Sequence, residues 1–421
     1  MTHTFQKPAS YSFGDIPLPG PLPLIFSQFQ GRRGDFGLGL LFEWIQHCKI
    51  DYEVTVVEGK RYSSYKNQLM EQARLKRKIQ NRLLGWFEKN ARDLPWRKTR
   101  DPYTIWISEI MLQQTQVATV IPYFQEFLGS FPTVRHLAKA DLSKVLKVWE
   151  GLGYYSRARN LHRASQIVVN HFAGKVPDNL KDLLSLPGIG RSTAGAVLSF
   201  AYNKDAPILD GNAKRVLSRL SAISGSPKER KTEHLLWCVS ESLLPKGHSN
   251  SFNQALMDLG SILCTPKDPQ CPLCPLRNLC KGAASGTPQR YPSKVAKRKI
   301  PHITALSAVI QRDGRVLLAQ RPPRGLLGGL WEFPNWKIEE EKGLRLRLRN
   351  YIKKEIGVDV KVKEPLGKFE QTFSHFKLTL HAYYCQATGK GKKGKWIPIK
   401  NLEQLAMPRI YRRIADVFSQ R

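Results

Sequence analysis

The sequence predicts a multidomain fold in which an all-α domain is followed by a smaller α+β domain. Three observations support this prediction. Apolar residues recur at helical spacing between about residues 76 and 280, where Ile79, Leu83 and Phe87 share one face. Beyond residue 300 the pattern changes to short β-rich runs with hairpin signals. The length of 421 residues also exceeds that of one typical domain.

Residues 1–75 form an N-terminal extension with no sustained hydrophobic period. Prolines alternate with other residues from Pro17 to Pro23, and glycines are frequent. Because such a segment has no continuous apolar face to bury, we expect it to be poorly ordered. We assign it no function and expect residues 1–69 to be dispensable, since the recognisable domain begins shortly after Met70.

The composition indicates a polyanionic partner. Lys and Arg number 67 against 34 Asp and Glu, which gives a formal net charge of +33. Excess positive charge attracts phosphate backbones through counterion release, so nucleic acid is the expected partner. No apolar run reaches the roughly 20 residues needed to span a bilayer, and no secretion signal opens the chain. We therefore expect a monomeric, cytoplasmic protein that associates with a bacterial nucleoid and not with a membrane.

A glycine-rich turn precedes a predicted helix in residues 186–201, LPGIGRSTAGAVLSFA. Gly188 and Gly190 would let backbone N–H groups approach an anion at the N-terminus of a helix that begins near Arg191. Such a turn can hold a DNA phosphate without reading the base sequence. An ordinary corner between two helices has the same pattern, so this motif gains weight only from its neighbours.

Four of the seven cysteines gather in CTPKDPQCPLCPLRNLC, with six, two and five residues between successive sulfurs. Clustered cysteines in a reducing compartment usually bind a metal. A zinc ribbon normally has two Cys-x-x-Cys pairs, whereas this segment has one pair flanked by single cysteines. The spacing favours an iron–sulfur cluster without excluding zinc. The candidate ligands are Cys264, Cys271, Cys274 and Cys280.

Asp210 opens another predicted helix, in the segment PILDGNAKRVLSRL. An aspartate in this place is most often only a helix N-cap. However, the order of the glycine turn, this segment and the four-cysteine loop resembles that of the helix-hairpin-helix DNA glycosylases with an iron–sulfur cluster. The resemblance covers residues 78–280 and implies a helix-hairpin-helix glycosylase domain at 76–280. It also implies that the loop at 264–280 holds a [4Fe-4S] cluster.

Two further stretches are similar to the adenine DNA glycosylase branch of that superfamily, the MutY type: SEIMLQQTQVATVIPYF at 108–124 and WEGLGYYSRARNLH at 149–162. Members that also cut the DNA backbone have a lysine after the hairpin as a Schiff-base nucleophile. Ser192 stands there in this chain and argues against such chemistry. The resemblance thus implies a monofunctional glycosylase that removes adenine mispaired with 8-oxoguanine, or with guanine, from double-stranded DNA.

Cleavage of an N-glycosidic bond needs a proton for the leaving base and a negative charge beside the cationic sugar. Two carboxyl groups in different protonation states meet these needs, and Glu109 and Asp210 are the candidates. The resemblance, together with the apolar setting ISEIMLQQ, implies that Glu109 is the acid, with a raised pKa. Asp210 would stabilise the cation, and Asn212 would orient the site.

Adenine must leave the base stack before it is cleaved. The resemblance implies that Gln114 and Tyr154 wedge into the duplex, that Thr115 touches the opposing lesion, and that the DLPWR segment helps to line the adenine pocket. The residues expected to bind substrate in this domain are Leu94, Trp96, Arg97, Gln114, Thr115, Tyr154 and Ser192.

Residues 281–300 are polar and basic without a period, which predicts a linker. Two β-rich runs around Asp313 and Gly314 then predict a hairpin, with a helix near 343–356 and strands at about 358–386. These elements assign residues 301–421 to the α+β domain.

Part of this tail, residues 328–360, resembles a Nudix domain. Of the acidic residues that would bind magnesium in a working Nudix box, only Glu355 is present at the matching positions, so pyrophosphate hydrolysis is not expected. The expected role is lesion recognition. The segment QTFSHFKL is similar to a loop that senses 8-oxoguanine through Phe373, Ser374 and His375.

Two alternative functions remain open. One is a bifunctional glycosylase and lyase acting on oxidised pyrimidines, against which Ser192 and the Nudix-like tail count. The other is a noncatalytic DNA-binding iron–sulfur protein, against which the presence of both Glu109 and Asp210 counts.

Overall fold

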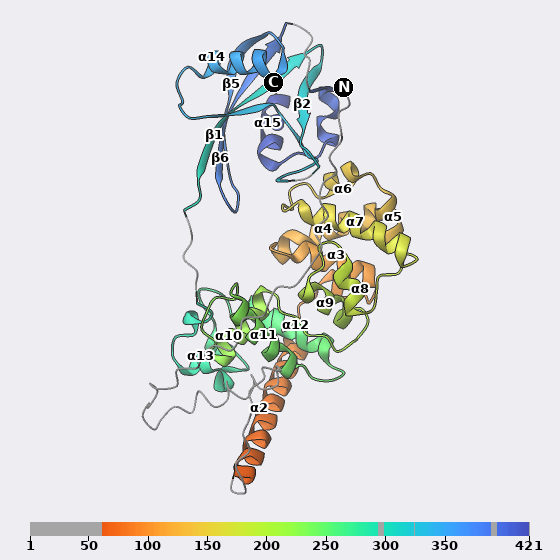
Figure 1. Cartoon of the computed structure of the whole chain (residues 1–421), viewed down its shortest axis with the longest axis vertical. Coiled ribbons are helices and arrows are strands. Elements are labelled where there is room, and N and C mark those ends of the chain that lie inside the picture. Colours follow the sequence, from red (N-terminus) through yellow and green to blue (C-terminus); the bar gives the residue numbers. More distant parts are fainter. Residues whose placement is uncertain (1–60, 294–298, 324, 389–393, 421) are drawn as a thin grey trace, which may run out of the picture.

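The structure, a computed structural model, describes residues 61–293, 299–323, 325–388 and 394–420. A helical part and a sheet-containing part follow each other along an elongated molecule (Figure 1). Most of the predicted N-terminal extension, residues 1–60, lies outside the described residues, so its expected lack of order stays a prediction.

The described chain opens with a 30-residue helix, α2 (Arg61–Asn90). It crosses the predicted boundary at residue 75, because good helix formers dominate the segment and it contains no proline and a single glycine, Gly85. Near its C-terminal end Ile79 and Leu83 are buried in the core of the helical part. The predicted helical domain is therefore longer at its start than its apolar period indicated.

One lobe of the helical part is built around the fully buried side chains of Trp106, Phe127 and Trp149. Its elements are η1 (Pro95–Arg97), α3 (Pro102–Leu112), α4 (Val117–Ser130), α5 (Val134–Lys139), α6 (Leu142–Val148), α7 (Ser156–His171), α8 (Leu180–Ser185) and α9 (Arg191–Phe200).

A second lobe packs around Phe252 and Leu217, together with the end of α2. Helix α9 contacts both α3 of the first lobe and α12 of the second, so residues of α3 and α12 come to face each other. The elements of the second lobe are α10 (Gly211–Ser221), α11 (Arg230–Leu243), α12 (Ser249–Ile262), η2 (Cys271–Leu273), η3 (Arg277–Leu279), α13 (Lys281–Ala284) and η4 (Pro288–Arg290).

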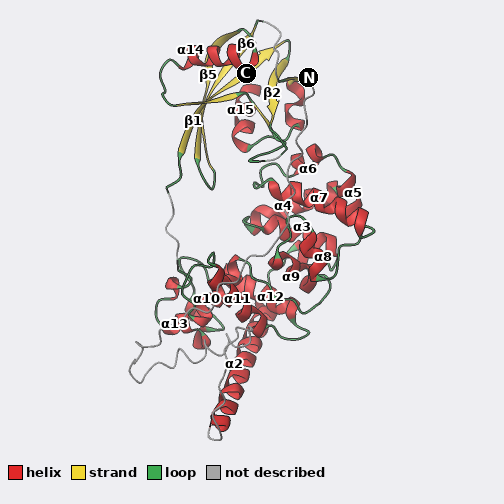
Figure 2. Ribbon diagram, in the orientation of Figure 1, coloured by secondary structure: helices red, strands yellow, loops and turns green. Residues whose placement is uncertain are grey.

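The strands of the described residues gather at one end of the molecule (Figure 2). They form one mixed sheet of order β3-β2-β1-β6-β5, with β4 also paired to β1 and β7 to β2. Strands β1 and β6 are parallel, and the other pairs are antiparallel. The strands are β1 (His302–Arg312), β2 (Arg315–Gln320), β3 (Trp331–Glu332), β4 (Asn335–Ile338), β5 (Val360–Thr372), β6 (Lys377–Ala387) and β7 (Lys395–Pro398).

Helices cover both faces of this sheet, and alternation along β1 explains why. Ala305 and Val309 pack with α15 (Arg409–Ser419), whereas Leu306 and Ile310 pack with α14 (Leu344–Tyr351). A π-helical turn, η5 (Ile352–Ile356), continues α14, and a 3-10 helix, η6 (Ile399–Gln404), precedes α15.

The predicted β-hairpin is confirmed by the β1–β2 turn. Asp313 and Gly314 both have positive φ, 49° and 67°, as expected for a two-residue hairpin loop. Glu355, the single acidic residue left at the Nudix positions, lies on η5. The all-α domain followed by an α+β domain is confirmed.

The sheet domain docks on the first lobe through a docking interface formed by Glu150, Leu330, Ala406 and Arg412. Leu330 and Ala406 are buried in the same cluster as the core of the first lobe. Arg412 Nε donates to Glu150 Oε1 at 2.8 Å, and both side chains are largely buried. Among the helices of the described ranges, none has the length and apolar character to cross a bilayer.

Candidate active site

Glu109 lies near the end of α3, whose other side chains are mostly buried and apolar. The helix begins at Pro102, with Asp101 as its N-cap accepting a hydrogen bond from the Thr104 N–H at 2.8 Å. Burial, followed by the negative charge of Asp210, raises the pKa of Glu109 to about 8, against an opposing effect of Arg97. Glu109 therefore keeps its proton at neutral pH.

Asp210 is the N-cap of α10, as the simpler interpretation of the sequence anticipated. Its Oδ1 accepts from the Ala213 N–H at 2.7 Å, and the Asn212 amide donates to Oδ2 at 3.3 Å. Burial raises the pKa of Asp210, but these hydrogen bonds and the Arg215 guanidinium oppose the rise. Asp210 thus has two hydrogen-bond donors and a nearby guanidinium that favour its charged form.

The residues beside Asp210 fix it in place. Arg215 Nη2 donates to Asn212 Oδ1 at 2.8 Å, and a Cβ at Gly260 would lie only 2.6 Å from Asn212 Cβ, so α12 approaches Asn212 closely. Ser192 Oγ accepts from the Leu209 N–H at 3.1 Å. Ser192 thus holds the segment that leads into Asp210.

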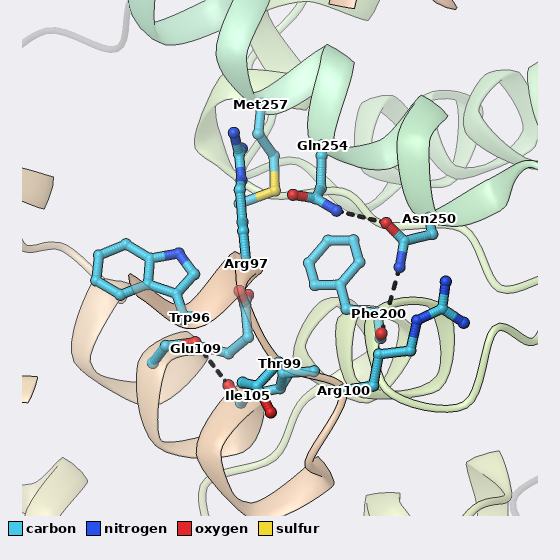
Figure 3. A pocket seen from close by; sticks show the side chains of 11 residues that line it. Trp96, Arg97, Thr99, Arg100, Ile105, Glu109, Phe200, Asn250, Gln254 and Met257 are labelled. Atoms are coloured by element: carbon cyan, nitrogen blue, oxygen red, sulfur yellow. Dashed lines mark hydrogen bonds between the residues drawn. The ribbon is translucent and has the colours of Figure 1, made fainter. Parts of the chain in front are cut away.

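A pocket of about 140 Å³ opens beside Glu109, and Trp96 and Arg97 line it with Glu109 (Figure 3). Cavities of this order, about 150 Å³, can hold one aromatic ring. Trp96 packs edge-on against Phe124, with ring centroids 5.4 Å apart. Leu94, also predicted here, instead lies in the core of the first lobe.

Helix α12 supplies the facing wall of the pocket with Asn250, Gln254 and Met257 (Figure 3). Gln254 donates to the Asn250 side chain, which donates to the Phe200 carbonyl at 3.2 Å. The sequence interpretation missed these residues. Their spacing at i, i+4 and i+7 places them on one helix face, which is a signal that could have found them.

An ion-pair network connects this wall to the segment that carries Trp96. Asp258 of α12 is fully buried and accepts two hydrogen bonds from Arg97, at 2.8 and 3.0 Å. Arg92 Nε donates to the same carboxylate at 2.7 Å. Bidentate pairs of this kind fix geometry as well as charge, so Arg97 holds the two sides of the pocket together.

The two predicted wedge residues share an uncommon backbone conformation. Gln114 has φ of 58° and Tyr154 φ of 47°, both in the left-handed region. Gln114 is exposed, and the side chain of Tyr154 is about half exposed. Thr115, half-buried beside Gln114, accepts a hydrogen bond from Arg157 at 3.1 Å.

The glycine turn lies before α9, as predicted. Gly188 has φ of 85°, and an added Cβ would meet Asn160 Cβ at 3.0 Å. Gly190 is the N-cap residue of α9, is exposed, and adds no side-chain cap. This exposed helix start without a side-chain cap suits the binding of a phosphate.

A larger pocket, of about 400 Å³, lies between the first lobe and the sheet domain. Tyr154 lines it from one side, and Phe373, Ser374 and His375 line it from the other. The latter three form the tight turn between β5 and β6, where Ser374 Oγ lies 3.0 Å from His375 Nδ1. The structure thus brings the predicted lesion loop to a predicted wedge residue.

The four clustered cysteines line a common pocket together with Arg219 and Arg277. Arg219 Nη1 donates to Cys264 Sγ at 3.2 Å. Burial raises the pKa of Cys274 to about 12 and raises the pKa values of Cys271 and Cys280 as well. Across the part of the chain that is described, no three His, Cys, Asp or Glu side chains form a group arranged for one metal ion.

Comparison with known families agrees with this arrangement. Residues 107–241 match the HhH-GPD superfamily base excision DNA repair protein family, and residues 305–417 match the NUDIX domain. The fold and the site therefore define a base excision DNA glycosylase with a Nudix-like domain.

Individual relatives indicate which kind of DNA glycosylase this chain resembles. The adenine DNA glycosylase of Buchnera aphidicola subsp. Acyrthosiphon pisum is 37% identical over 345 residues, which are 80% of this chain and 97% of the relative. The human adenine DNA glycosylase is 34% identical over 364 residues, 73% of this chain and 67% of the relative. A solved thermostable thymine-DNA glycosylase is 32% identical and covers 51% of this chain and 99% of its own, with a TM-score of 0.47.

The chain belongs to the adenine DNA glycosylase family. It is a hydrolase that removes adenine from DNA by cleaving the N-glycosidic bond in base excision repair.

Proposed function

We propose that this enzyme removes adenine paired with 8-oxoguanine, or more slowly with guanine, and that Glu109 and Asp210 carry the chemistry. The observation that carries the proposal is that Glu109 lines a pocket with Trp96 and has its pKa raised by burial and by the negative charge of Asp210. We assign the proton to Glu109, whose pKa is raised to about 8, and the negative charge to Asp210, where hydrogen bonds and the Arg215 guanidinium oppose the rise in pKa.

The extruded adenine would enter the 140 Å³ pocket, where Trp96 offers an aromatic surface and Gln254 an amide for its polar edge. Glu109 donates its proton to a ring nitrogen of the base as the glycosidic electron pair moves onto the base. The sugar becomes cationic, and the Asp210 carboxylate stabilises it. Water then adds to the sugar carbon and gives up a proton, which leaves an abasic site.

Gln114 and Tyr154 would fill the space that the base leaves in the duplex, with Thr115 beside them. The turn with Phe373, Ser374 and His375 would contact the opposing base. 8-Oxoguanine differs from guanine by a carbonyl at C8 and an N–H at N7, so a hydroxyl that can donate or accept suits that edge. The 400 Å³ pocket supports this proposal because Tyr154 and the turn face each other across it.

The remaining sites would hold the duplex and the fold. Gly188 and Gly190 would bind a DNA phosphate at the start of α9. We propose that the protein acts as a monomer on chromosomal DNA, and hence at the nucleoid of a bacterial cell.

We also propose that Cys264, Cys271, Cys274 and Cys280 ligate a [4Fe-4S] cluster. The shared pocket and the guanidinium groups of Arg219 and Arg277 support this, since a cluster on four thiolates carries negative charge. Bound there, the cluster would join the loop to α10 and supply structural stability. Ligation would also require the thiols to lose the protons that burial now favours.

The test compares single-turnover excision of adenine opposite 8-oxoguanine and opposite guanine. Ser374→Ala and His375→Ala should reduce the preference for the lesion, each lost bond costing about 1–3 kcal/mol of discrimination. Cleavage opposite guanine should persist. Lys400→Ala, at an exposed position outside the pocket, is the control. An unchanged preference in both loop variants would contradict the assigned role of the turn.

The same reactions separate the alternative functions. A monofunctional enzyme leaves an abasic site that breaks only after alkali treatment. Strand breaks without alkali would favour the lyase, and the absence of both products would favour a noncatalytic DNA-binding protein.

A further inference from the structure

Arg157 joins the two loops that carry the wedge residues. It lies on α7 with only 8% of its surface exposed. Its Nη1 donates to carbonyl oxygens at the end of α3, those of Ile110, Met111 and Gln113, at 3.0, 2.7 and 2.6 Å. Its Nη2 donates to the carbonyl oxygens of Leu152 and Gly153, at 3.1 and 3.2 Å, and to the Thr115 hydroxyl.

Two of these acceptors have a particular position in the chain. The Gln113 carbonyl immediately precedes Gln114, and the Gly153 carbonyl immediately precedes Tyr154. Both following residues are in the left-handed region, which non-glycine residues enter only when surrounding contacts over-determine the backbone. One guanidinium therefore holds the peptide bond that leads into each of these strained residues.

The same side chain also contacts aromatic rings. The guanidinium carbon lies 5.6 Å from the ring centroid of Tyr154 and 5.4 Å from that of Trp149. Trp149 is fully buried, so Arg157 connects a fixed part of the core to the half-exposed Tyr154. Burial lowers the pKa of Arg157 to about 10, which leaves it charged at neutral pH.

We infer that Arg157 is a positioning residue that sets Gln114 and Tyr154 at a fixed mutual distance, so that they enter the duplex as one rigid wedge. This inference rests on the proposed role of those two residues. Only a planar, forked group with several donors can bridge two loops in this way. Lysine, with one ammonium group, would keep the charge but hold only one side.

The experiment measures extrusion directly, with 2-aminopurine in place of the adenine, because its fluorescence rises when it leaves the base stack. Arg157→Lys should bind the duplex within a few-fold of wild type at fixed salt. Its fluorescence change should be small, and single-turnover excision of adenine from the mispair should fall by about 100-fold, as expected for a misplaced group. Each rate is divided by the concentration of active enzyme, measured from the burst amplitude, so that a smaller fraction of folded protein does not lower the rate.

A second substrate separates positioning from general damage. When adenine lies opposite an abasic-site analogue there is no partner base to displace, and Arg157→Lys should then cleave within a few-fold of wild type. Arg163→Lys, at an exposed position on the same helix, is the matched control for both substrates. Equal losses on the two substrates, or normal extrusion by Arg157→Lys, would overturn the inference.

Tyr154→Ala and Gln114→Ala test separately the proposed wedge role of these two residues, on which the inference about Arg157 rests. If these variants extrude 2-aminopurine normally, the wedge assignment itself is wrong. If they fail to extrude it while Arg157→Lys succeeds, the wedge stands and only the role of Arg157 is rejected.

Discussion

A carboxyl group that donates a proton to adenine must still carry that proton at the pH of the cell. For Glu109, burial and the charge of Asp210 provide this condition by raising its pKa to about 8. We therefore predict that the single-turnover rate falls as pH rises through about 8. Glu109→Gln should be nearly inactive and lack this alkaline limb, which a rate profile from pH 5 to 9.5 would reveal. If the residual activity of Glu109→Gln still falls above pH 8, the alkaline limb belongs to a group other than Glu109.

The raised pKa of Glu109 also has a consequence for stability. Between the ordinary value of 4.5 and about 8, the folded protein binds a proton that the unfolded chain has lost. Stability due to this group therefore decreases as pH rises through that range. We predict that the Tm of Glu109→Gln rises relative to the Tm of wild type as the pH increases from 5 to 8. A pH-independent difference would contradict the raised pKa.

Asp210 caps α10, and one substitution separates this structural role from the proposed catalytic role. Asparagine caps helices well, so Asp210→Asn should retain its Tm and its affinity for DNA at fixed salt. Loss of the negative charge beside the cationic sugar should reduce the single-turnover rate by about 10²-fold or more. Removing that charge also lowers the pKa of Glu109, so the residual activity should decline at lower pH than in wild type. Near-normal excision would leave Asp210 as a cap alone.

At the scale of elements, the four-cysteine loop contributes one fully buried leucine, Leu276, to the core, and Leu273 at η2 is strongly exposed. We predict that protein purified without oxygen contains iron and sulfide in equal amounts and absorbs broadly at visible wavelengths. Cys274→Ser should lose this absorbance and lower Tm. Cys385→Ser removes a buried thiol elsewhere and should keep the absorbance. One zinc and no iron in the wild type would reject the cluster.

Elements with a strong local signal were predictable from the sequence. The hairpin at Asp313 and Gly314 follows from backbone preferences of those two residues, and helix α9 follows from the glycines before it. The start of α2 was not predicted, because residues 61–75 show no apolar period in the sequence. Local preference marks such elements clearly, whereas an apolar period marks only the part of a helix that packs and so does not show where the helix begins.

The candidate site was predictable only where chemistry marks a residue. Glu109 and Asp210 are carboxyl groups in apolar or capping contexts, and both could be found from the sequence. Asn250 and Gln254 on α12 resemble ordinary helix-surface amides, and only the packing of α12 opposite α3 gives them a pocket to line. In the sequence, Arg157 looks the same as an arginine exposed to solvent. Its acceptors are mostly backbone carbonyls, and a sequence motif does not show which carbonyls a side chain will reach.

For the whole molecule, the docking interface sets the position of the proposed lesion loop relative to Tyr154, a proposed wedge residue. Its charged contact joins Glu150 and Arg412 in a largely buried setting. We predict that Glu150→Gln and Arg412→Met each reduce the preference for 8-oxoguanine over guanine. The double variant should be no worse than the poorer single variant, with a coupling of about 0.5–3 kcal/mol. Excision assays on both mispairs measure this cycle, and strictly additive losses would show that the contact does not position the domain.

Leu330 and Ala406 belong to the Nudix-like segment by sequence and to the helical lobe by burial. If the domain senses the lesion as proposed, this sensing is therefore not a portable module in this chain. A chimera that joined residues 301–421 to a foreign glycosylase would carry Leu330 and Ala406 without the surface that buries them. This chain without residues 301–421 would in turn expose that apolar surface to water. Anyone who engineers new base specificity by exchanging such tails should transfer the receiving surface on the first lobe together with the domain.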